Sequence, residues 1–161
     1  SLGKLEEGKV DVQSETIELE SFFQEIEEDL RSTLKAGQKI LVECNSGIKS
    51  INTDGRILRN ILFNLISNAS KYSGENKNIF IRCKSADEEI AFHIVDEGIG
   101  IPESDLKHIF ERFFRATNAN NIQGTGLGLN IVRRYVELLG GQITFDSEYG
   151  KGSTFKITLP I

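Results

Sequence analysis

Hydrophobic residues recur along the chain with two different periods, which divide the sequence into helices and strands. Apolar residues at helical spacing predict helices over residues 20–35, 55–72 and 127–139. Alternation of apolar and polar residues predicts strands, which we place at residues 40–44, 51–53, 79–83, 90–94, 141–147 and 153–159. The polar segment Ser85–Glu89 separates two of these strands and predicts a hairpin turn.

The order of these elements predicts a two-layer α/β sandwich. A mixed, largely antiparallel sheet of about five strands, covered on one face by three helices, would bury all of the apolar faces. Residues 1–10 are polar and carry no core pattern, so we expect a linker or the end of a preceding helical domain. Residues 11–161 would form one domain, with a short helix near 103–108 and a mobile segment at 115–124.

The composition is that of an ordinary globular domain. The 161 residues carry a net charge of −5 without a basic cluster, which argues against binding nucleic acid. No apolar run approaches the roughly 20 residues of a membrane helix, and no segment has the pattern of a signal peptide. Cys44 and Cys83 lack metal-site spacing, and we expect both to be unpaired core residues of strands in a reducing compartment.

A polar band follows one margin of the predicted helix 55–72. Asn64, Asn68 and Lys71 fall within roughly 60° of one another beside the apolar face. Asparagine is a poor helix former, so its presence here needs a reason. An amide oxygen suits Mg²⁺, a lysine can contact a phosphate, and Tyr72 adds an aromatic face. The alternative interpretation is a solvated polar margin.

Two glycine loops follow. In the first, Asp96 ends an apolar strand, and its carboxylate could accept a hydrogen bond from the adenine amine. Gly98 and Gly100 permit positive φ and close approach of a ligand, although a simple glycine turn would show the same pattern.

The second loop, at residues 124–129, opens a helix, where free N–H groups and the helix dipole favour phosphate. It is neither a Walker A loop nor a Rossmann turn, and the alternative is a flexible hinge.

In order and spacing these motifs resemble the ATP-binding domain of sensor histidine kinases, which belongs to the superfamily of gyrase, Hsp90 and MutL. Five segments carry the resemblance across residues 11–161. They are Asn64–Tyr72 (the N box), Asp96–Gly100 (the first G box), Ile109–Arg115 (the F box), Gly124–Leu129 (the second G box) and Gly150–Phe155 (the closing motif). The resemblance implies the Bergerat-type ATP-binding fold with an ATP lid at about 103–124.

The resemblance also implies roles for the matching residues. Asn68 would be the principal Mg²⁺ ligand, and Asn64 would lie near the metal and the phosphates. Lys71 would contact the phosphates, Tyr72 the nucleotide and Asp96 the adenine amine, while Arg115 would reach the γ-phosphate. The other implied nucleotide contacts are Gly98, Gly100, Ile101, Phe113, Gly124, Thr125, Gly126, Leu127, Gly128, Leu129 and Thr154.

Kinases of this family transfer the γ-phosphoryl group of Mg-ATP to a histidine on a separate dimerisation domain, and a response regulator then receives it. His93 and His108 match no phosphoacceptor motif, so we expect both to be structural. The resemblance thus implies a cytoplasmic, monomeric fragment of a homodimeric, membrane-anchored kinase, which binds ATP but does not phosphorylate itself.

Three other functions are compatible with the same fold. ATPases of the gyrase, Hsp90 and MutL type have a glutamate base one turn before the metal asparagine, where this chain has Asn64. A serine kinase of the anti-sigma type is disfavoured by the F box. A domain that senses ATP without catalysis is disfavoured by the full set of ligand residues.

Overall fold

The fold was analysed in a computed structural model, which describes residues 11–44, 47–100 and 128–161. Its main feature is a five-stranded sheet with the strand order β2-β4-β5-β7-β6. β2 pairs with β4 in parallel, and the other neighbours are antiparallel. The strands are β2 (Lys39–Cys44), β4 (Asn78–Ala86), β5 (Glu89–Asp96), β6 (Gln142–Glu148) and β7 (Gly152–Pro160).

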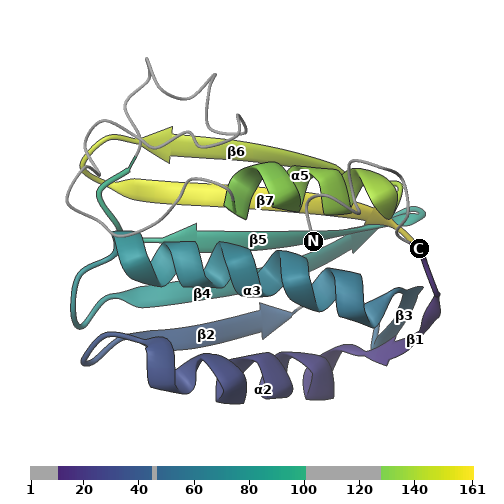
Figure 1. Cartoon of the computed structure of the whole chain (residues 1–161), viewed down its shortest axis with the longest axis horizontal. Coiled ribbons are helices and arrows are strands. Elements are labelled where there is room, and N and C mark those ends of the chain that lie inside the picture. The colour runs from purple at the N-terminus through teal and green to yellow at the C-terminus, as the bar shows by residue number, and fades with distance from the viewer. Residues whose placement is uncertain (1–10, 45–46, 101–127) are drawn as a thin grey trace.

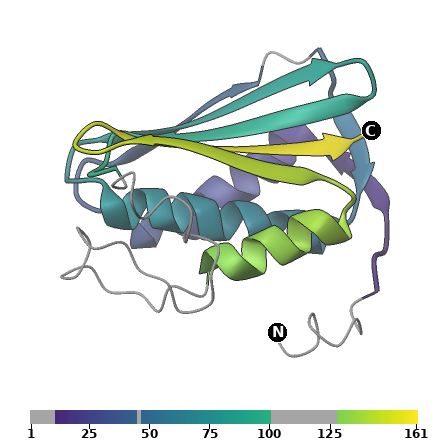
Figure 2. The same ribbon diagram turned by 90° about the horizontal axis from the view of Figure 1, so that it is seen from above.

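Three helices cover one face of this sheet: α2 (Leu19–Leu30), α3 (Gly55–Tyr72) and α5 (Gly128–Leu138). Figure 1 shows α3 between α2 and α5, and Figure 2 shows all three on the same side of the sheet. The apolar stripe of α3, which includes Leu58, Leu62 and Leu65, is fully buried against strand residues such as Ile81 and Phe92. The predicted two-layer sandwich is therefore confirmed.

The start of α3 is fixed by a side chain. Asp54 is the N-cap, and its Oδ1 accepts hydrogen bonds from the backbone N–H groups of Arg56 (3.0 Å) and Ile57 (3.2 Å). These groups would otherwise have no partner in the first turn of the helix. Oδ2 of Asp54 also accepts from the N–H of Gln13 (2.9 Å), which holds the segment before β1 against the same helix end.

Local boundaries differ from the sequence-based expectation in three places. β3 (Ser50–Thr53) leaves the main sheet and pairs with β1 (Glu15–Glu18), a strand that the sequence did not predict. Only Ile17 is buried in β1, so its four residues carry almost no periodic signal. α2 ends at Leu30 and continues as a short 3₁₀ helix (Arg31–Thr33). The β4–β5 hairpin turn consists of only Asp87 and Glu88, because both strands extend into the predicted turn.

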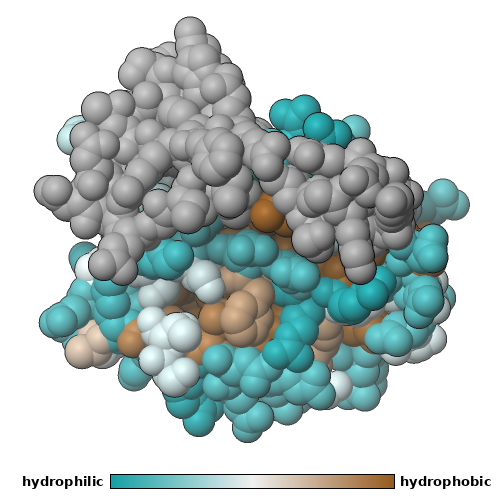
Figure 3. Space-filling model, viewed as in Figure 1, coloured by the Kyte–Doolittle hydropathy of each residue, from teal (hydrophilic) through white to brown (hydrophobic). Residues whose placement is uncertain are grey.

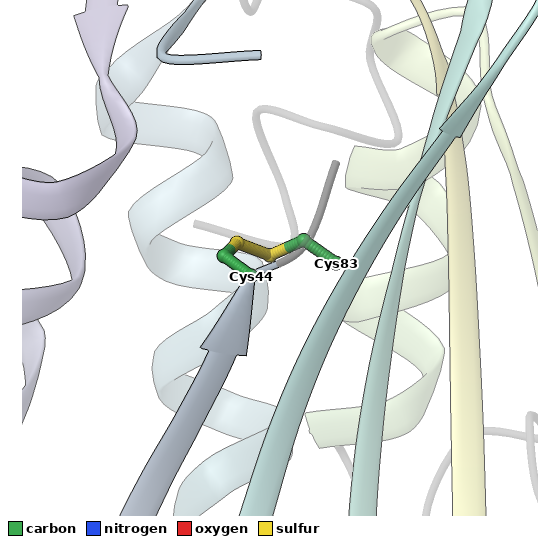
Figure 4. Close-up of a disulfide and its surroundings, with 2 residues drawn as sticks. All are labelled: Cys44 and Cys83. Atoms are coloured by element: carbon green, nitrogen blue, oxygen red, sulfur yellow. A yellow bond between two sulfur atoms is a disulfide. The ribbon is translucent and has the colours of Figure 1, made fainter. Parts of the chain in front are cut away.

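The expectation of two unpaired cysteines is wrong, because Cys44 and Cys83 form a disulfide (Figure 4). β2 and β4 are neighbours, and their register places the two cysteines side by side with their Cα atoms 4.4 Å apart. Paired residues on adjacent strands point to the same face, within the range that a disulfide can bridge. Their pairing depends on the parallel contact of β2 and β4, which the 39-residue separation does not reveal.

No helix in the described ranges is long and apolar enough to cross a membrane. The predicted helix at 103–108 and the predicted mobile segment at 115–124 lie outside the residues that the structure describes.

Candidate nucleotide site

Four chain segments that are distant in sequence meet at one end of the sandwich. They are the C-terminal end of α3, the end of β5 at Asp96, the N-terminal end of α5 and the turn between β6 and β7. Figures 1 and 2 both show these ends on the same side of the molecule. The sequence-predicted residues on α3, β5 and α5 are therefore brought to one end of the molecule.

The polar margin of α3 runs from the groove beside α2, which Asn60 and Asn64 line, toward α5. The opposite margin contains Arg59, which pairs with Asp29 of α2, and Ser70, which bonds to Gln38. Asn68 lies on the other side of the helix circumference from Arg59, and α5 packs against α3 on that side. Asn64 and Asn68 are half-buried and Lys71 is exposed, so all three remain accessible to a ligand. Nδ2 of Asn64 donates to the carbonyl of Asn60 (2.9 Å).

Asp96 is buried at the end of β5, with 8% of its surface exposed. Its Oδ1 accepts two backbone hydrogen bonds, from Gly98 (2.9 Å) and from Ser153 of β7 (3.3 Å). Burial raises the pKa of this carboxyl from 3.8 to about 6, against the lowering effect of those two hydrogen bonds. At neutral pH the group is thus mostly ionised, and Oδ2 can accept a hydrogen bond from an amine.

The first glycine loop is packed between the end of α3 and the β6–β7 turn. The N–H of Ile99 donates to the Tyr72 carbonyl (3.1 Å), and the Ile99 carbonyl accepts from the N–H of Gly150 (2.6 Å). A Cβ on Gly98 would collide with the Tyr72 carbonyl, and one on Gly100, whose φ is +72°, would collide with the Glu148 carbonyl. Both glycines are therefore required by close approach of the protein's own backbone, a reason that the sequence did not reveal.

The N-terminal end of α5 completes the described part of the site. Val132, Tyr135 and Val136 are buried and hold the helix against the core. Figure 1 shows that α5 begins on the side of the molecule where α3 and β5 end. The positive end of the helix dipole favours an anion here.

Sequence reasoning missed Ser153, which lies directly opposite Asp96 in the β5–β7 register. Its hydroxyl also contacts the hydroxyl of Ser147 on β6 (2.8 Å), so polar side chains extend from Asp96 across three strands. The predicted contact residue Thr154 is paired with Val95, and its side chain lies on the other face of the sheet. Alternate residues of a strand point to the same face, so Ser153 shares the buried face of Phe155. This alternation would have selected Ser153 instead of Thr154.

Comparison with known proteins identifies the family. Residues 53–161 match the family described as histidine kinase-, DNA gyrase B-, and HSP90-like ATPases. The chain belongs to this family. It is an ATP-binding domain of the histidine kinase type, because its relatives and structural neighbours are sensor histidine kinases.

Two of these relatives are similar over almost the whole chain. The aerobic respiration control sensor protein ArcB of Escherichia coli is 36% identical over 98% of this chain, and the circadian input-output histidine kinase CikA of Synechococcus elongatus is 33% identical over 99%. The alignments cover 21% and 22% of those proteins, so the chain spans about a fifth of the length of the curated relatives that it matches.

Solved structures of the same type share the fold. The mycobacterial sensor histidine kinase MprB has a TM-score of 0.78 and 26% identity, with 92% of this chain and 97% of that chain covered. Full-length ShkA in complex with AMPPNP has a TM-score of 0.82 and 26% identity, with 94% of this chain and 32% of that chain covered. The fold of this ATP-binding domain is thus that of histidine kinase catalytic domains.

Several predicted contacts of this histidine kinase-type domain lie outside the described residues. They are Ile101, Phe113, Arg115 and the glycine-loop residues Gly124, Thr125, Gly126 and Leu127. His108 also lies outside.

His93 is on β5, three residues before Asp96. Because side chains alternate between the two faces of a strand, His93 lies on the face away from Asp96. Its Nδ1 is buried without a hydrogen-bond partner. Burial and the nearby Lys156 and Lys84 lower the pKa of His93, which suits a neutral structural side chain.

The domain also has a groove of about 750 Å³ between β1, α2 and α3. Figure 3 shows a hydrophobic area between α2 and α3 with hydrophilic side chains around it. The groove is lined by three glutamates (Glu15, Glu18 and Glu25) and by two arginines (Arg56 and Arg59), and Asn64 also lines it. Of the candidate site residues, Asn68, Lys71 and Asp96 are not part of its lining.

The donor set of the candidate site fits a magnesium ion. Among the described residues no group of three or more histidine, cysteine, aspartate or glutamate side chains could hold a metal. Mg²⁺ in nucleotide sites usually has one or two protein oxygen ligands, with waters and phosphate oxygens as the others. The half-buried amide of Asn68, close to the exposed Lys71, supplies one such oxygen without a negative charge that would repel the phosphates.

Proposed function

We propose that this ATP-binding domain transfers the γ-phosphoryl group of Mg-ATP to a histidine of a separate phosphoacceptor and dimerisation domain of the same kinase. A response regulator would then accept the group. The observation that carries the proposal is that α3 ends, β5 ends and α5 begins at one end of the sandwich, with Asn68 and Lys71 near the end of α3 and Asp96 at the end of β5. The complex of full-length ShkA, which has the same fold, with AMPPNP supports nucleotide binding by this domain.

Each group at the site would have a distinct role. Oδ2 of Asp96 would accept a hydrogen bond from the adenine amine, which selects adenine because guanine has a carbonyl oxygen at that position. Lys71, the N–H groups at the start of α5 and Arg115 would contact the phosphates and stabilise the charge that develops during transfer. Asn68 would hold the magnesium ion, with Asn64 close by, and the bound ion would neutralise phosphate charge.

Residue 64 distinguishes phosphoryl transfer from ATP hydrolysis. It lies one helical turn before Asn68, where ATPases of the superfamily have a glutamate that activates water. The Asn64 amide cannot accept a proton in this way, and its Nδ2 donates to the Asn60 carbonyl. The domain should therefore hold ATP for an external nucleophile, and the imidazole of the acceptor domain would be that nucleophile.

The surrounding assembly is part of the same proposal. We infer that this domain lies in the cytoplasm, as part of a membrane-anchored homodimer whose dimerising helices belong to the phosphoacceptor domain. Separated from those helices, the domain would be a monomer.

The proposal is tested by mixing this domain, a separately produced phosphoacceptor domain of the same kinase and γ-³²P-ATP with Mg²⁺. We expect an acid-labile label on the acceptor domain alone, and none when its histidine is changed to alanine. Without the acceptor domain, phosphate release should stay slow compared with transfer. Rapid phosphate release with no labelled protein would indicate an ATPase, and an acid-stable label would indicate a serine kinase; either result would refute the proposal.

A further inference from the structure

The C-terminal end of α3 is stabilised by a loop that precedes it by more than 30 residues. This loop, Lys35–Gln38, connects the 3₁₀ helix to β2. Gln38 is buried, with 6% of its surface exposed. Its Oε1 accepts hydrogen bonds from the Lys35 N–H (2.9 Å) and the Ser70 hydroxyl (2.6 Å). Both acceptor positions of the amide oxygen are therefore used.

The amide nitrogen of Gln38 donates to backbone carbonyls at the end of α3. Nε2 lies 3.1 Å from the Ser70 carbonyl, 3.2 Å from that of Ser73 and 3.1 Å from that of Gly74. The last carbonyls of a helix have no partner within the helix. Many helices satisfy them with a left-handed glycine, but the C-cap of α3 is Ser73 in an extended conformation. Gln38 supplies the missing donors in its place.

Lys35 supports the same helix end from the surface. Its Nζ donates to the carbonyls of Lys71 and Ser73, at 2.8 Å each. The N–H of Asn76 donates to the Ala36 carbonyl (2.9 Å), so the loops on both sides are also joined through their backbones. The end of α3 is thus held by side-chain and backbone hydrogen bonds from the Lys35–Gln38 loop.

This helix end is also the support of the nucleotide site. Tyr72 lies between the carbonyls that Gln38 and Lys35 hold, and its own carbonyl accepts the Ile99 N–H (3.1 Å). Ile99 belongs to the same loop as Gly98, whose N–H binds Oδ1 of Asp96 (2.9 Å). A shift of the end of α3 would therefore displace Lys71, Tyr72 and the loop around Asp96 together.

We propose that Gln38 is a positioning residue for the nucleotide site, which acts through the carbonyls of Ser70, Ser73 and Gly74 to fix the α3 end and the loop at residues 96–100. The inference rests on the proposed nucleotide-binding role of these two segments. Gln38 does not contact the nucleotide. It sets the geometry of residues that do, because a misplaced phosphate- or adenine-binding group weakens binding even when the fold is intact.

The test uses Gln38→Glu, which keeps the shape and the acceptor oxygen but replaces the donor with an oxygen that repels three carbonyls. Gln142→Glu makes the same chemical change at an exposed position on β6. Ile90→Val removes one methylene from a fully buried side chain at the far end of β5 and controls for a general loss of stability. Gln38→Met, which has a similar length and no strong hydrogen-bonding group, is the second variant if Gln38→Glu does not fold.

Two measurements are made on each variant: the Kd for Mg-ATP by titration calorimetry and, without nucleotide, amide hydrogen exchange of Ile99 by NMR. For the Gln38 variants we expect binding weaker by on the order of tenfold. We also expect Ile99 exchange to be faster by a larger factor than that of core amides such as Phe92. Both control variants should keep the Kd of the unaltered domain and its ratio of Ile99 to Phe92 exchange.

The outcomes separate this inference from the proposed function. If the Gln38 variants bind Mg-ATP as the unaltered domain does, or if Ile99 and Phe92 exchange change by the same factor, the positioning role is refuted. Failure of the unaltered domain to bind Mg-ATP would refute the proposed function, while the exchange ratio would still decide whether Gln38 fixes the loop.

Discussion

Asp96 combines burial with two backbone hydrogen bonds, and the two effects act on its pKa in opposite directions. Burial penalises the charged form, whereas the N–H groups of Gly98 and Ser153 stabilise it. Burial is the larger effect, so the pKa rises to about 6. The carboxylate is thereby desolvated and held in place before a ligand arrives, which makes a hydrogen bond to an incoming amine stronger than it would be in water.

The raised pKa makes the stability of the domain depend on pH. Because the folded-state pKa is about 6 and the ordinary value is 3.8, the native state binds more protons than the unfolded state between these pH values. Relative to Asp96→Asn, the unaltered domain should gain unfolding free energy as the pH falls from 7 to 4, by at most about 3 kcal/mol. Guanidinium unfolding curves of both proteins across this range measure the difference. A difference that does not vary with pH would contradict the burial of the carboxylate.

Asn68 provides the second prediction at this scale. Asn68→Ala should weaken Mg-dependent ATP binding by about ten- to a hundredfold, because the removed oxygen would contact a charged group. The half-buried side chain makes no large contribution to the core, so the thermal unfolding midpoint should change little.

The matched control is Asn60→Ala, two turns earlier on the same margin and exposed. It should keep the affinity of the unaltered domain in the same calorimetric titration. Equal affinity of Asn68→Ala and the unaltered domain would show that the metal is held elsewhere.

At the scale of elements, the sequence predicted those helices and strands that have a strong periodic pattern, but not the contacts between them. The apolar stripe of α3 and the alternation of β4 and β5 predicted these elements to within a few residues. β1 carries one buried residue and gave no signal. The parallel pairing of β2 with β4, which brings Cys44 to Cys83, joins strands separated by β3 and α3. No local sequence pattern indicates that β2 and β4 are neighbours in the sheet.

The candidate site residues could be selected from the sequence to the same extent. Asn64, Asn68 and Asp96 could be selected because each breaks a local rule: polar side chains beside an apolar helix face, or a carboxylate directly after a buried strand. Ser153 and Gln38 break no such rule. Their roles follow from the register between β5 and β7 and from the packing of the Lys35–Gln38 loop on α3.

The packing of the first glycine loop leads to a prediction. Gly98→Ala should lower the unfolding free energy by about 1–3 kcal/mol and weaken ATP binding, because the new Cβ collides with the rigid Tyr72 carbonyl. Gly74→Ala is the control, since nothing lies within 4 Å of its added Cβ. Urea unfolding and ATP titration of both variants make the comparison. If Gly98→Ala is tolerated as well as Gly74→Ala, the loop does not pack on α3 as described.

The disulfide joins the last residue of β2 to β4 (Figure 4). It closes a loop of 39 residues, which should stabilise the fold by about 2–4 kcal/mol. A reducing agent should therefore lower the unfolding midpoint of the unaltered domain, and Cys44→Ser should remove this response. Alkylation followed by mass spectrometry reports the state of the thiols. Complete alkylation of both cysteines under native, non-reducing conditions would contradict the bond.

At the scale of the whole molecule, packing of the helical layer on the sheet brings the ends of three elements together. No local sequence pattern predicts that these ends are close in space. α3 ends, β5 ends and α5 begins on the same side, so a polar margin, a buried carboxylate and a helix dipole face one region. Binding of Mg-ATP at this end is the central claim.

A crystal structure of the domain with Mg²⁺ and a non-hydrolysable ATP analogue tests this claim most directly. We expect the adenine amine within hydrogen-bond distance of Oδ2 of Asp96, the metal on Oδ1 of Asn68, and the phosphates between Lys71 and the first turn of α5. Ordered nucleotide in the groove beside Glu15, Glu18 and Glu25, or at any place remote from Asp96 and Asn68, would contradict the account.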